Sequence, residues 1–179
     1  MQDIQVLVRL NKVLKVKFVF VENTGDSPAF FRTLIAFECP EGVTYSAADD
    51  GQAKMIFNLN QSEDIVWDEL GYDTIAGQRY YLMSATYQSV LKPGDISEPS
   101  LLQVAMHHTA GKQELELMGD TYEILAVSQA VQSTNFNDAS NALNVAFGPL
   151  SESSHPWRSE ADGGQPPYET VPVNYIPVS

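Results

Sequence analysis

The amino-acid sequence predicts an all-β domain, a β-sandwich, followed by an extended and mostly irregular C-terminal arm. Three observations carry this prediction. Short apolar runs rich in β-branched and aromatic residues recur up to about residue 127. Turn residues separate these runs at the regular intervals that two facing sheets require. The composition then changes, so we divide the 179-residue chain into a sandwich over residues 1–127 and an arm over residues 128–179.

The first two long strands show the clearest patterns. From residue 14 to residue 21, one face is wholly apolar, while the other begins with Lys15 and Lys17. The turn Asn23-Thr24-Gly25-Asp26 ends this strand. A second strand covers residues 30–39, and Pro40-Glu41-Gly42 closes it, because proline cannot donate to a sheet and glycine tolerates positive φ.

Further short runs predict the remaining strands of an immunoglobulin-like sandwich with eight or nine strands. They cover residues 43–47, 54–60, 64–67, 78–90, 101–108 and 114–126. Chain reversals are predicted at Asp49-Asp50-Gly51, Ala76-Gly77, Lys92-Pro93-Gly94-Asp95 and Ala110-Gly111-Lys112. No stretch before residue 127 is expected to be helical, whereas the partly helical spacing of residues 138–147 allows one short helix.

The arm after Val127 has the composition of a tail that carries apolar anchors. Its 52 residues contain six of the ten prolines and no lysine, and they offer too few apolar residues for a second core. Large apolar side chains are nevertheless spaced along it, and we predict that they bind partner proteins. The predicted partner-binding residues are Phe136, Phe147, Trp157, Tyr168, Tyr175 and Ile176.

The charge and the cysteine content of the chain limit which binding partners and which cellular compartment we expect. Asp and Glu number 23 against 10 Lys and Arg, which leaves a formal net charge of −13. Such a field repels phosphate groups, so we expect no nucleic acid and no membrane as partner; a basic protein surface and simple solubility both remain open. The single cysteine, Cys39, excludes an internal disulfide and is expected to be a buried thiol. Because we find neither a secretory signal nor a membrane-spanning stretch, we expect a protein made in the cytoplasm.

Several short segments of the sequence carry a resemblance to a known family. They are Val19-Phe20-Val21-Glu22-Asn23-Thr24-Gly25, Cys39-Pro40-Glu41-Gly42-Val43-Thr44-Tyr45 and Ile75-Ala76-Gly77-Gln78, with Trp67 ahead of the last one. Residues 15–90 thereby resemble the bacterial adhesion-type Ig-like repeats, a CARDB-like family of surface and stalk proteins. We expect Val43, Tyr45 and Trp67 to face the core. The resemblance implies a fold and no particular activity, because this architecture hosts many unrelated functions.

We find no constellation that predicts catalysis or a metal site, and we expect no cofactor. A nucleophilic Ser or Cys would need a His beside it, and no Gly-x-Ser-x-Gly turn occurs. The neighbours His107 and His108 would point to opposite faces of a strand, and His155 stands alone, so ordinary polar histidines are expected. Loop carboxylates could bind calcium, but a solvated acidic face is favoured because their spacing is not that of a dedicated loop. These pairs are Asp49-Asp50, Glu63-Asp64 and Asp68-Glu69.

Two classes of function are favoured, and an enzyme is a third, less favoured class that would need a pocket with convergent polar groups. The leading expectation is a non-enzymatic structural protein of a large assembly, a phage or virus particle in particular, in which the chain decorates or cements the capsid. Its arm would clamp neighbouring subunits, including copies of itself, in a virion assembled in the host cytoplasm. The alternative is a glycan-binding or adhesion module, cytoplasmic or on the cell surface, in which exposed tyrosines stack on sugar. Its candidate tyrosines, which core packing also explains, are Tyr72, Tyr80, Tyr81 and Tyr87.

Overall fold

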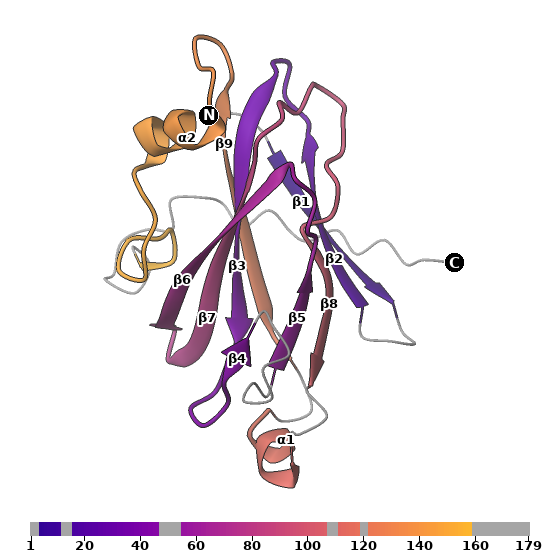
Figure 1. Cartoon of the computed structure of the whole chain (residues 1–179), viewed down its shortest axis with the longest axis vertical. Helices are drawn as coiled ribbons and strands as arrows, with labels where there is room; N and C mark the ends of the chain where they lie inside the picture. Colours follow the sequence, from indigo (N-terminus) through magenta and orange to yellow (C-terminus); the bar gives the residue numbers. More distant parts are fainter. Residues whose placement is uncertain (1–3, 12–15, 47–54, 107–110, 119–121, 159–179) are drawn as a thin grey trace.

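The computed structural model describes residues 4–11, 16–46, 55–106, 111–118 and 122–158, and its fold is all-β, as predicted (Figure 1). The strands are β1 (Ile4–Asn11), β2 (Val16–Asn23), β3 (Ala29–Glu38), β4 (Tyr45–Ser46), β5 (Met55–Leu59), β6 (Ile65–Ile75), β7 (Gln78–Tyr87), β8 (Leu101–Met106) and β9 (Ile124–Gln132). The helices are α1 (Lys112–Met118) and α2 (Ala139–Phe147).

The largest sheet contains four antiparallel strands in the order β6-β7-β3-β9. The predicted reversal at Ala76 and Gly77 joins β6 to β7, and both residues have positive φ, at 51° and 85°. Two positive φ values match the tight two-residue hairpin turn that suits the twist of the flanking strands. Strand β3 lies inside the sheet, between β7 and the much later β9, and the hydroxyls of Thr33 and Ser128 meet across this pairing at 2.7 Å.

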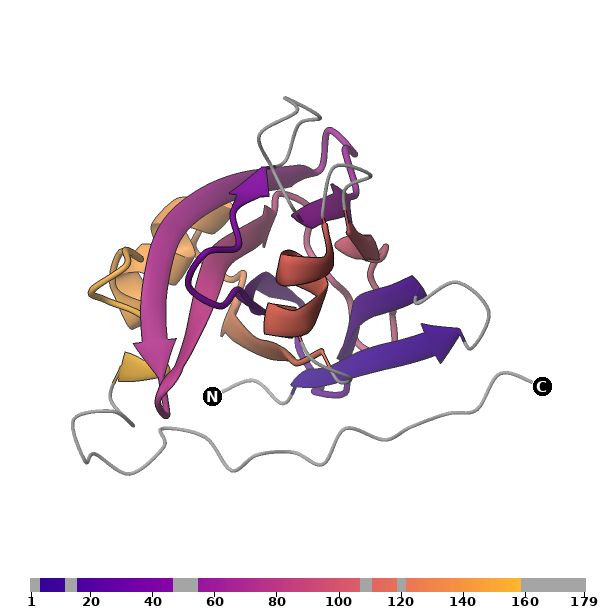
Figure 2. The same ribbon diagram turned by 90° about the horizontal axis from the view of Figure 1, so that it is seen from below.

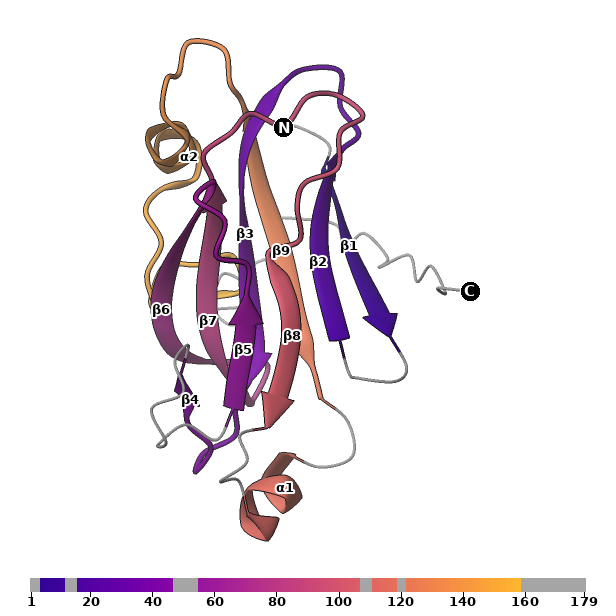
Figure 3. The ribbon, with the colours of Figure 1, turned by 45° about the vertical axis from the view of Figure 1, so that its right-hand side comes forward.

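The other strands lie over one face of this sheet (Figure 3). Strands β4, β5 and β8 form a three-stranded sheet, and β1 and β2 form an antiparallel hairpin. The segment before β8 connects these two small sheets, because the amides of Ser97 and Ser100 donate to the carbonyl oxygens of Val21 and Val19 at 2.8 and 2.9 Å. The result is a two-layered arrangement, while the immunoglobulin-like arrangement of its strands stays a prediction.

The main core lies between the two layers. Alternation along β3 points Phe31, Ile35 and Phe37 toward the second layer, where all three are buried. Phe37 stacks on Phe57 of β5 with ring centroids 3.6 Å apart. Cys39 is fully buried at the edge of this core, as predicted. Burial raises the pKa of its thiol to about 11, despite the opposing charge of Arg79, so a reactive thiolate is disfavoured.

The opposite, outer face of the four-stranded sheet is covered as well (Figure 2). On this face β3 presents Phe30, Leu34 and Ala36, and all three are buried. Helix α2 covers Phe30 with its own apolar side, and residues 149–158 cover the region around Leu34 and Ala36. The buried residues of the helix are Ala139, Ala142 and Leu143. Strand β3 is therefore enclosed on both faces.

The structure departs from the predicted division of the chain. The boundary at Val127 falls inside β9, and residues 128–158 continue as strand, helix and packed loop instead of an irregular arm. The helix allowed over residues 138–147 is confirmed as α2, and its first turn is capped by the Asp138 carboxylate, which accepts from the Asn141 amide at 2.7 Å. Residues 159–179 lie outside the described residues.

The strand predicted over residues 114–126 is wrong in its first part. Helix α1 occupies Lys112–Met118, although Glu and Leu alternate there as polar and apolar residues do in a half-buried strand. The backbone N–H of Gly111 donates to the Glu114 carboxylate at 2.7 Å, and Lys112 pairs with Glu116 one turn later at 3.5 Å. Such local contacts at three- and four-residue spacing favour a helix over a strand.

Candidate functional site

Three of the six predicted partner-binding residues lie in the described chain, and all three pack against its own sheet. Phe136 and Phe147 are half-buried beside Phe30. Trp157 is only 9% exposed and belongs to the cluster on the outer face of the sheet. These side chains thus hold the C-terminal part of the described chain in place. The other three, Tyr168, Tyr175 and Ile176, lie outside the described residues.

Residues 149–158, which we call the C-terminal anchor, follow α2 directly. Gly148, with a φ of 84°, ends the helix. Ser151 and Ser154 then exchange backbone hydrogen bonds of 3.0 and 3.1 Å in a tight turn. Beyond this turn, Trp157 inserts among the apolar side chains of β3 and β7. The anchor therefore brings the chain back across the outer face of the sheet, from α2 to strand β6.

A carboxylate on β6 fastens the end of the anchor. Asp73 Oδ2 accepts hydrogen bonds from His155 Nε2 at 2.9 Å and from Arg158 Nε at 3.1 Å, and Arg158 Nη2 reaches Oδ1 at 3.3 Å. The His155 side chain is fully buried, whereas 45% of the Arg158 side chain is exposed. Burial acts to raise the pKa of Asp73, but hydrogen bonds from the Thr74 amide, His155 and Arg158 outweigh it and hold the pKa below its ordinary value.

We expect the Asp73→Asn variant to lose about 1–2 kcal/mol of unfolding free energy at pH 7, because it weakens hydrogen bonds to a charged acceptor. Since folding lowers the pKa of Asp73, its contribution is complete above the ordinary Asp value of about 3.9 and is lost as the pH falls below that. Urea unfolding of both proteins should therefore show a gap at pH 7 that closes toward pH 3. A gap of equal size at both pH values would contradict this account.

The matched control for this prediction is Asp68→Asn. Asp68 lies on the same strand, but its side chain is exposed. Exposed substitutions of this kind change stability by no more than about 0.5 kcal/mol. The control variant should follow the wild type at both pH values, which separates the role of the anchor contact from a general change in net charge.

A buried arginine joins α2 to the sheet. Arg32 on β3 is 4% exposed. Its Nε donates to Gln129 Oε1 at 2.7 Å, its Nη1 to Asn144 Oδ1 at 3.0 Å, and its Nη2 to the Gly148 carbonyl oxygen at 2.9 Å. The last two acceptors lie at the C-terminal end of α2, where backbone carbonyl oxygens concentrate partial negative charge and favour a cation. Arg32 thereby fixes the point from which the anchor starts.

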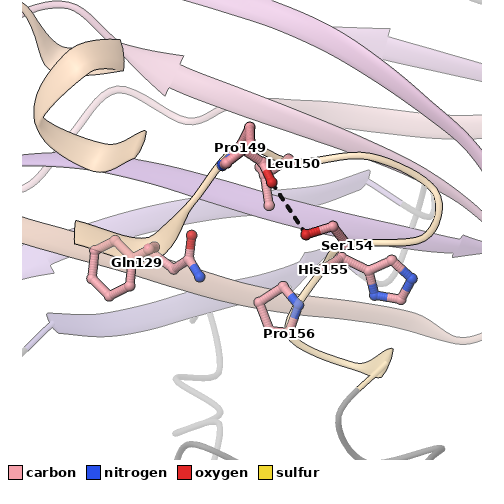
Figure 4. Close-up of a pocket in the computed structure, with 7 residues that line it drawn as sticks. Gln129, Pro149, Leu150, Ser154, His155 and Pro156 are labelled. Atoms are coloured by element: carbon pink, nitrogen blue, oxygen red, sulfur yellow. Dashed lines mark hydrogen bonds between the residues drawn. The ribbon is translucent and has the colours of Figure 1, made fainter. Parts of the chain in front are cut away.

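A pocket of about 200 Å³ opens between β9, the end of α2 and the anchor (Figure 4). Its volume is below the roughly 300–1,000 Å³ of pockets that hold cofactors and drug-sized ligands. It is therefore of a size for one side chain or a very small molecule. Its lining residues are Gln129, Phe147, Pro149, Leu150, Ser154, His155 and Pro156.

The Ser154, His155 and Asp73 side chains have the residue types of a hydrolytic triad, but not its geometry. In a triad one ring nitrogen of the histidine contacts the carboxylate and the other contacts the serine hydroxyl. Here the Ser154 hydroxyl donates to the Pro149 carbonyl oxygen at 3.2 Å. His155 Nδ1 is buried without a hydrogen-bond partner in the described part of the chain. The arrangement can therefore fasten the anchor, and it does not activate a nucleophile.

Most of the tyrosines considered for sugar stacking belong to the core. Tyr80, Tyr81 and Tyr87 are between 2% and 6% exposed, and Tyr72 is half-buried beneath the Arg79 guanidinium. The hydroxyls of Tyr80 and Tyr81 donate to carboxylates, and burial together with these contacts raises the pKa of both phenols. The accepting carboxylates belong to Glu123 and Glu69. Core packing therefore accounts for these side chains.

The acidic pairs that the structure describes are Glu63-Asp64 and Asp68-Glu69. Within the described residues, no group of three or more His, Cys, Asp or Glu side chains converges. Glu63, Asp68 and Glu69 are exposed. The remaining candidates, Asp49, Asp50, His107 and His108, lie outside the described residues.

Neither helix in the described part of the chain has the length and apolarity needed to cross a membrane. No protein-family model matches the chain, and no curated protein or solved structure is significantly similar to it.

Proposed function

We propose that this chain is a non-enzymatic structural protein of a large assembly, such as a phage or virus particle. In this proposal an immunoglobulin-like sandwich decorates or cements the shell, and residues 159–179 bind a neighbouring subunit. The observation that carries the proposal is the C-terminal anchor, which holds residue 158 at a defined place beside edge strand β6.

The anchor favours partner binding because it fixes the start of the segment that follows. Trp157 is packed into the outer-face cluster, and Arg158 contacts Asp73 through two nitrogens. A binding segment that starts from a fixed point searches less volume, and so loses less freedom when it docks. The same Trp157 that covers the outer face of the sheet therefore also sets where the following segment begins.

The composition of residues 159–179 fits docking on another protein. Proline recurs among apolar residues there, and this pattern favours an extended backbone that presents side chains to a groove or adds to a sheet edge. The candidate contact residues that remain after the burial of Phe136, Phe147 and Trp157 are Tyr168, Tyr175 and Ile176. The net charge of −13 favours a basic surface on the partner.

Deletion of residues 159–179 should release the protein from its assembly. In gradient sedimentation of extracts from the cells that naturally make the protein, the full chain should migrate with particles far larger than its own 19.8 kDa. The shortened chain should migrate as a small protein, because the segment that contacts the neighbour is missing. Particle association that is unchanged by the deletion would rule out residues 159–179 as the clamp.

A shuffled tail is the matched control for this deletion. A chain with residues 159–179 in scrambled order keeps length, charge and composition but loses the order of the apolar contacts. It should behave like the deletion if specific side chains bind the partner. Circular dichroism and tryptophan emission should match the wild type in both variants, because Trp67 and Trp157 both pack in clusters of the chain before residue 159. A full chain that sediments alone would refute the assembly itself.

A further inference from the structure

We propose that the first half of strand β6 binds an extended, basic segment of another protein by adding it to the sheet. We call residues 65–69, the part of β6 before its bulge, the docking edge. The inference goes beyond the assembly proposed above and does not involve residues 159–179. It rests on the backbone of β6, on the side chains that hold it and on the charge around it.

Strand β6 lies at the border of the four-stranded sheet (Figure 3). It pairs with β7 from Ile65 to Ile75. Within the described residues, no strand pairs with its other side. A border strand carries backbone N–H and C=O groups that its own sheet does not use, and a strand from another protein can form hydrogen bonds with them.

The register of the β6–β7 pairing shows which backbone groups point outward. The Gln88 amide donates to the Asp64 carbonyl oxygen at 2.8 Å, in register with the ladder, so these two residues form a hydrogen-bonded pair. Hydrogen-bonded and non-hydrogen-bonded pairs alternate along antiparallel strands. The even-numbered residues of the docking edge therefore bond to β7, whereas Trp67 and Glu69 direct their N–H and C=O groups away from it. In the described part of the chain, no backbone hydrogen bond from outside the sheet reaches these groups.

The side chains of these two residues hold the docking edge in place. The Trp67 indole packs in the core, and its Nε1 donates to the Asn60 carbonyl oxygen at 2.9 Å. The Glu69 carboxylate accepts from the Tyr81 hydroxyl at 2.7 Å. Because the backbone of β6 is already ordered, only the incoming strand loses conformational freedom on binding, and this lowers the entropic cost.

The charge around the docking edge favours a basic occupant. Glu63, Asp64, Asp68 and Glu69 lie on it or directly before it, and Glu152 of the anchor lies beside the bulge that ends it. Asp68 and Glu69 are exposed. Lysine or arginine side chains on an added strand would come close to these carboxylates, and cross-strand pairs of opposite charge stabilise a sheet.

A second copy of this chain does not suit the docking edge. No Lys or Arg occurs from residue 55 to residue 78, so pairing of two β6 strands would bring only like charges together. Charged side chains on border strands prevent such self-pairing. The carboxylates therefore both exclude a second copy and attract a basic strand, and this difference gives the docking edge its specificity.

Antiparallel addition also predicts the order of side chains in the partner. Antiparallel pairs are the slightly more stable kind. Read from its N-terminus, the partner strand would place basic residues opposite Glu69 and Asp68, then one further residue opposite Trp67. An apolar residue would follow opposite Val66, which is 44% exposed. The expected partner thus carries two adjacent basic residues with an apolar residue two positions after them.

Nuclear magnetic resonance of the full-length chain tests the proposal with the capped peptide Lys-Lys-Thr-Val-Thr-Val-Thr. The amide protons of Trp67 and Glu69 should move downfield as the peptide is added, because each gains a hydrogen bond. When about nine-tenths of the edges are filled, exchange of these two protons with solvent should slow about tenfold, because they exchange only from unfilled molecules. Exchange of the Val66 and Asp68 amides, which already bond to β7, should change little.

Methylation of single peptide nitrogens is the matched control for the backbone. In the antiparallel arrangement the amide of the third peptide residue faces Trp67, whereas the amide of the fourth points away from β6. Methylation of the third nitrogen should abolish the shifts, and methylation of the fourth should preserve them. The two peptides have the same length and charge, so the comparison isolates the hydrogen bonds.

Charge reversal tests the choice of partner. Asp68→Lys should weaken binding of the Lys-Lys peptide about fivefold and should strengthen binding of a peptide that begins with Glu-Glu. Asp26→Lys changes the net charge equally in the exposed turn between β2 and β3. This control variant should bind the Lys-Lys peptide like the wild type.

Two results would overturn the binding of a basic strand. Trp67 and Glu69 amides that stay unchanged at millimolar peptide, or that respond equally to both methylated peptides, would show that the docking edge does not pair. Equal binding of the Lys-Lys and Glu-Glu peptides by the wild type would show that charge does not select the partner.

Two further results would assign the docking edge to another occupant and so also overturn the proposal. Trp67 and Glu69 amides that shift with protein concentration in the absence of peptide would show pairing between copies. Amides that shift on deletion of residues 159–179, again without peptide, would show that the chain covers its own edge. Each of these readouts is independent of the sedimentation experiment, so the docking edge and the assembly can fail separately.

Discussion

Trp157→Ala should lower the free energy of unfolding by about 3–5 kcal/mol, which is the range for removing a large buried aromatic side chain. Trp157 is 9% exposed and covers Leu34, Ala36 and Leu82, which are fully buried beneath the anchor. Truncation removes the ring and leaves a cavity above the sheet. Urea unfolding monitored by circular dichroism measures the loss, and Trp67 remains as the only fluorescent tryptophan.

Two measurements make this result specific. Trp157→Phe keeps an aromatic ring and should cost less than half as much as the alanine variant. Hydrogen exchange should show that residues 149–158 lose protection in Trp157→Ala, whereas β5 and β8 of the second layer keep it. If the loss of stability stays below about 1 kcal/mol, the anchor is a separate element that opens without the sheet, and the proposed fixed exit point is wrong.

Arg32→Met should be about as damaging, with an expected loss of about 2–5 kcal/mol. Methionine replaces the length of the side chain but leaves three acceptors without their donor: Gln129 Oε1, Asn144 Oδ1 and the Gly148 carbonyl oxygen. Each unsatisfied buried polar group costs about 1–3 kcal/mol, and relaxation toward water recovers part of the total. Arg32→Lys should rescue little, because a single ammonium group cannot reproduce the planar fork of a guanidinium.

Arg158→Met is the matched control for the buried arginine. Arg158 also pairs with a neighbour, but 45% of its side chain is exposed, so its loss should cost about 1 kcal/mol or less. The comparison separates burial from charge, since both variants remove one positive charge. Equal losses in the two variants would show that the Arg32 network contributes no more than a surface pair.

The strands that pair along the sheet could be predicted because their alternation is local. The runs around residues 14–21 and 30–39 became β2 and β3, and the two-residue reversal at Ala76 and Gly77 joins β6 to β7. Strand β6 is longer than the predicted residues 64–67, because the polar pairs Asp68-Glu69 and Asp73-Thr74 interrupt its apolar residues and hide its period. A bulge between Glu69 and Gly71 further interrupts the alternation.

The cover of the outer face could not be read from the composition of residues 128–179, because prolines and polar residues dominate there. The missing signal was in β3 itself. Phe30, Leu34 and Ala36 make its second face apolar, and a strand that is apolar on both faces needs a cover on each side. The apolar second face of β3 therefore predicts that another element covers it. The sequence does not identify the segment that does so.

The contacts of the candidate site could not be predicted for a different reason. His155 and Asp73 are 82 positions apart, and Arg32 and Gln129 are 97 positions apart. Nothing near either residue marks its partner, because the pairing depends on how distant segments meet on one sheet. Only the isolated features were visible: one histidine in a proline-rich region, and one arginine within an apolar strand.

The double enclosure of β3 also determines when this protein can fold during synthesis. An early strand must wait for β9 to close one edge and for residues 139–158 to cover its second face. Contacts between such distant segments slow folding. A nascent chain that has left the ribosome only as far as residue 127 still presents Leu34 and Ala36 to the surrounding water. Until the last residues of the anchor emerge, this strand is open to association with other incomplete chains.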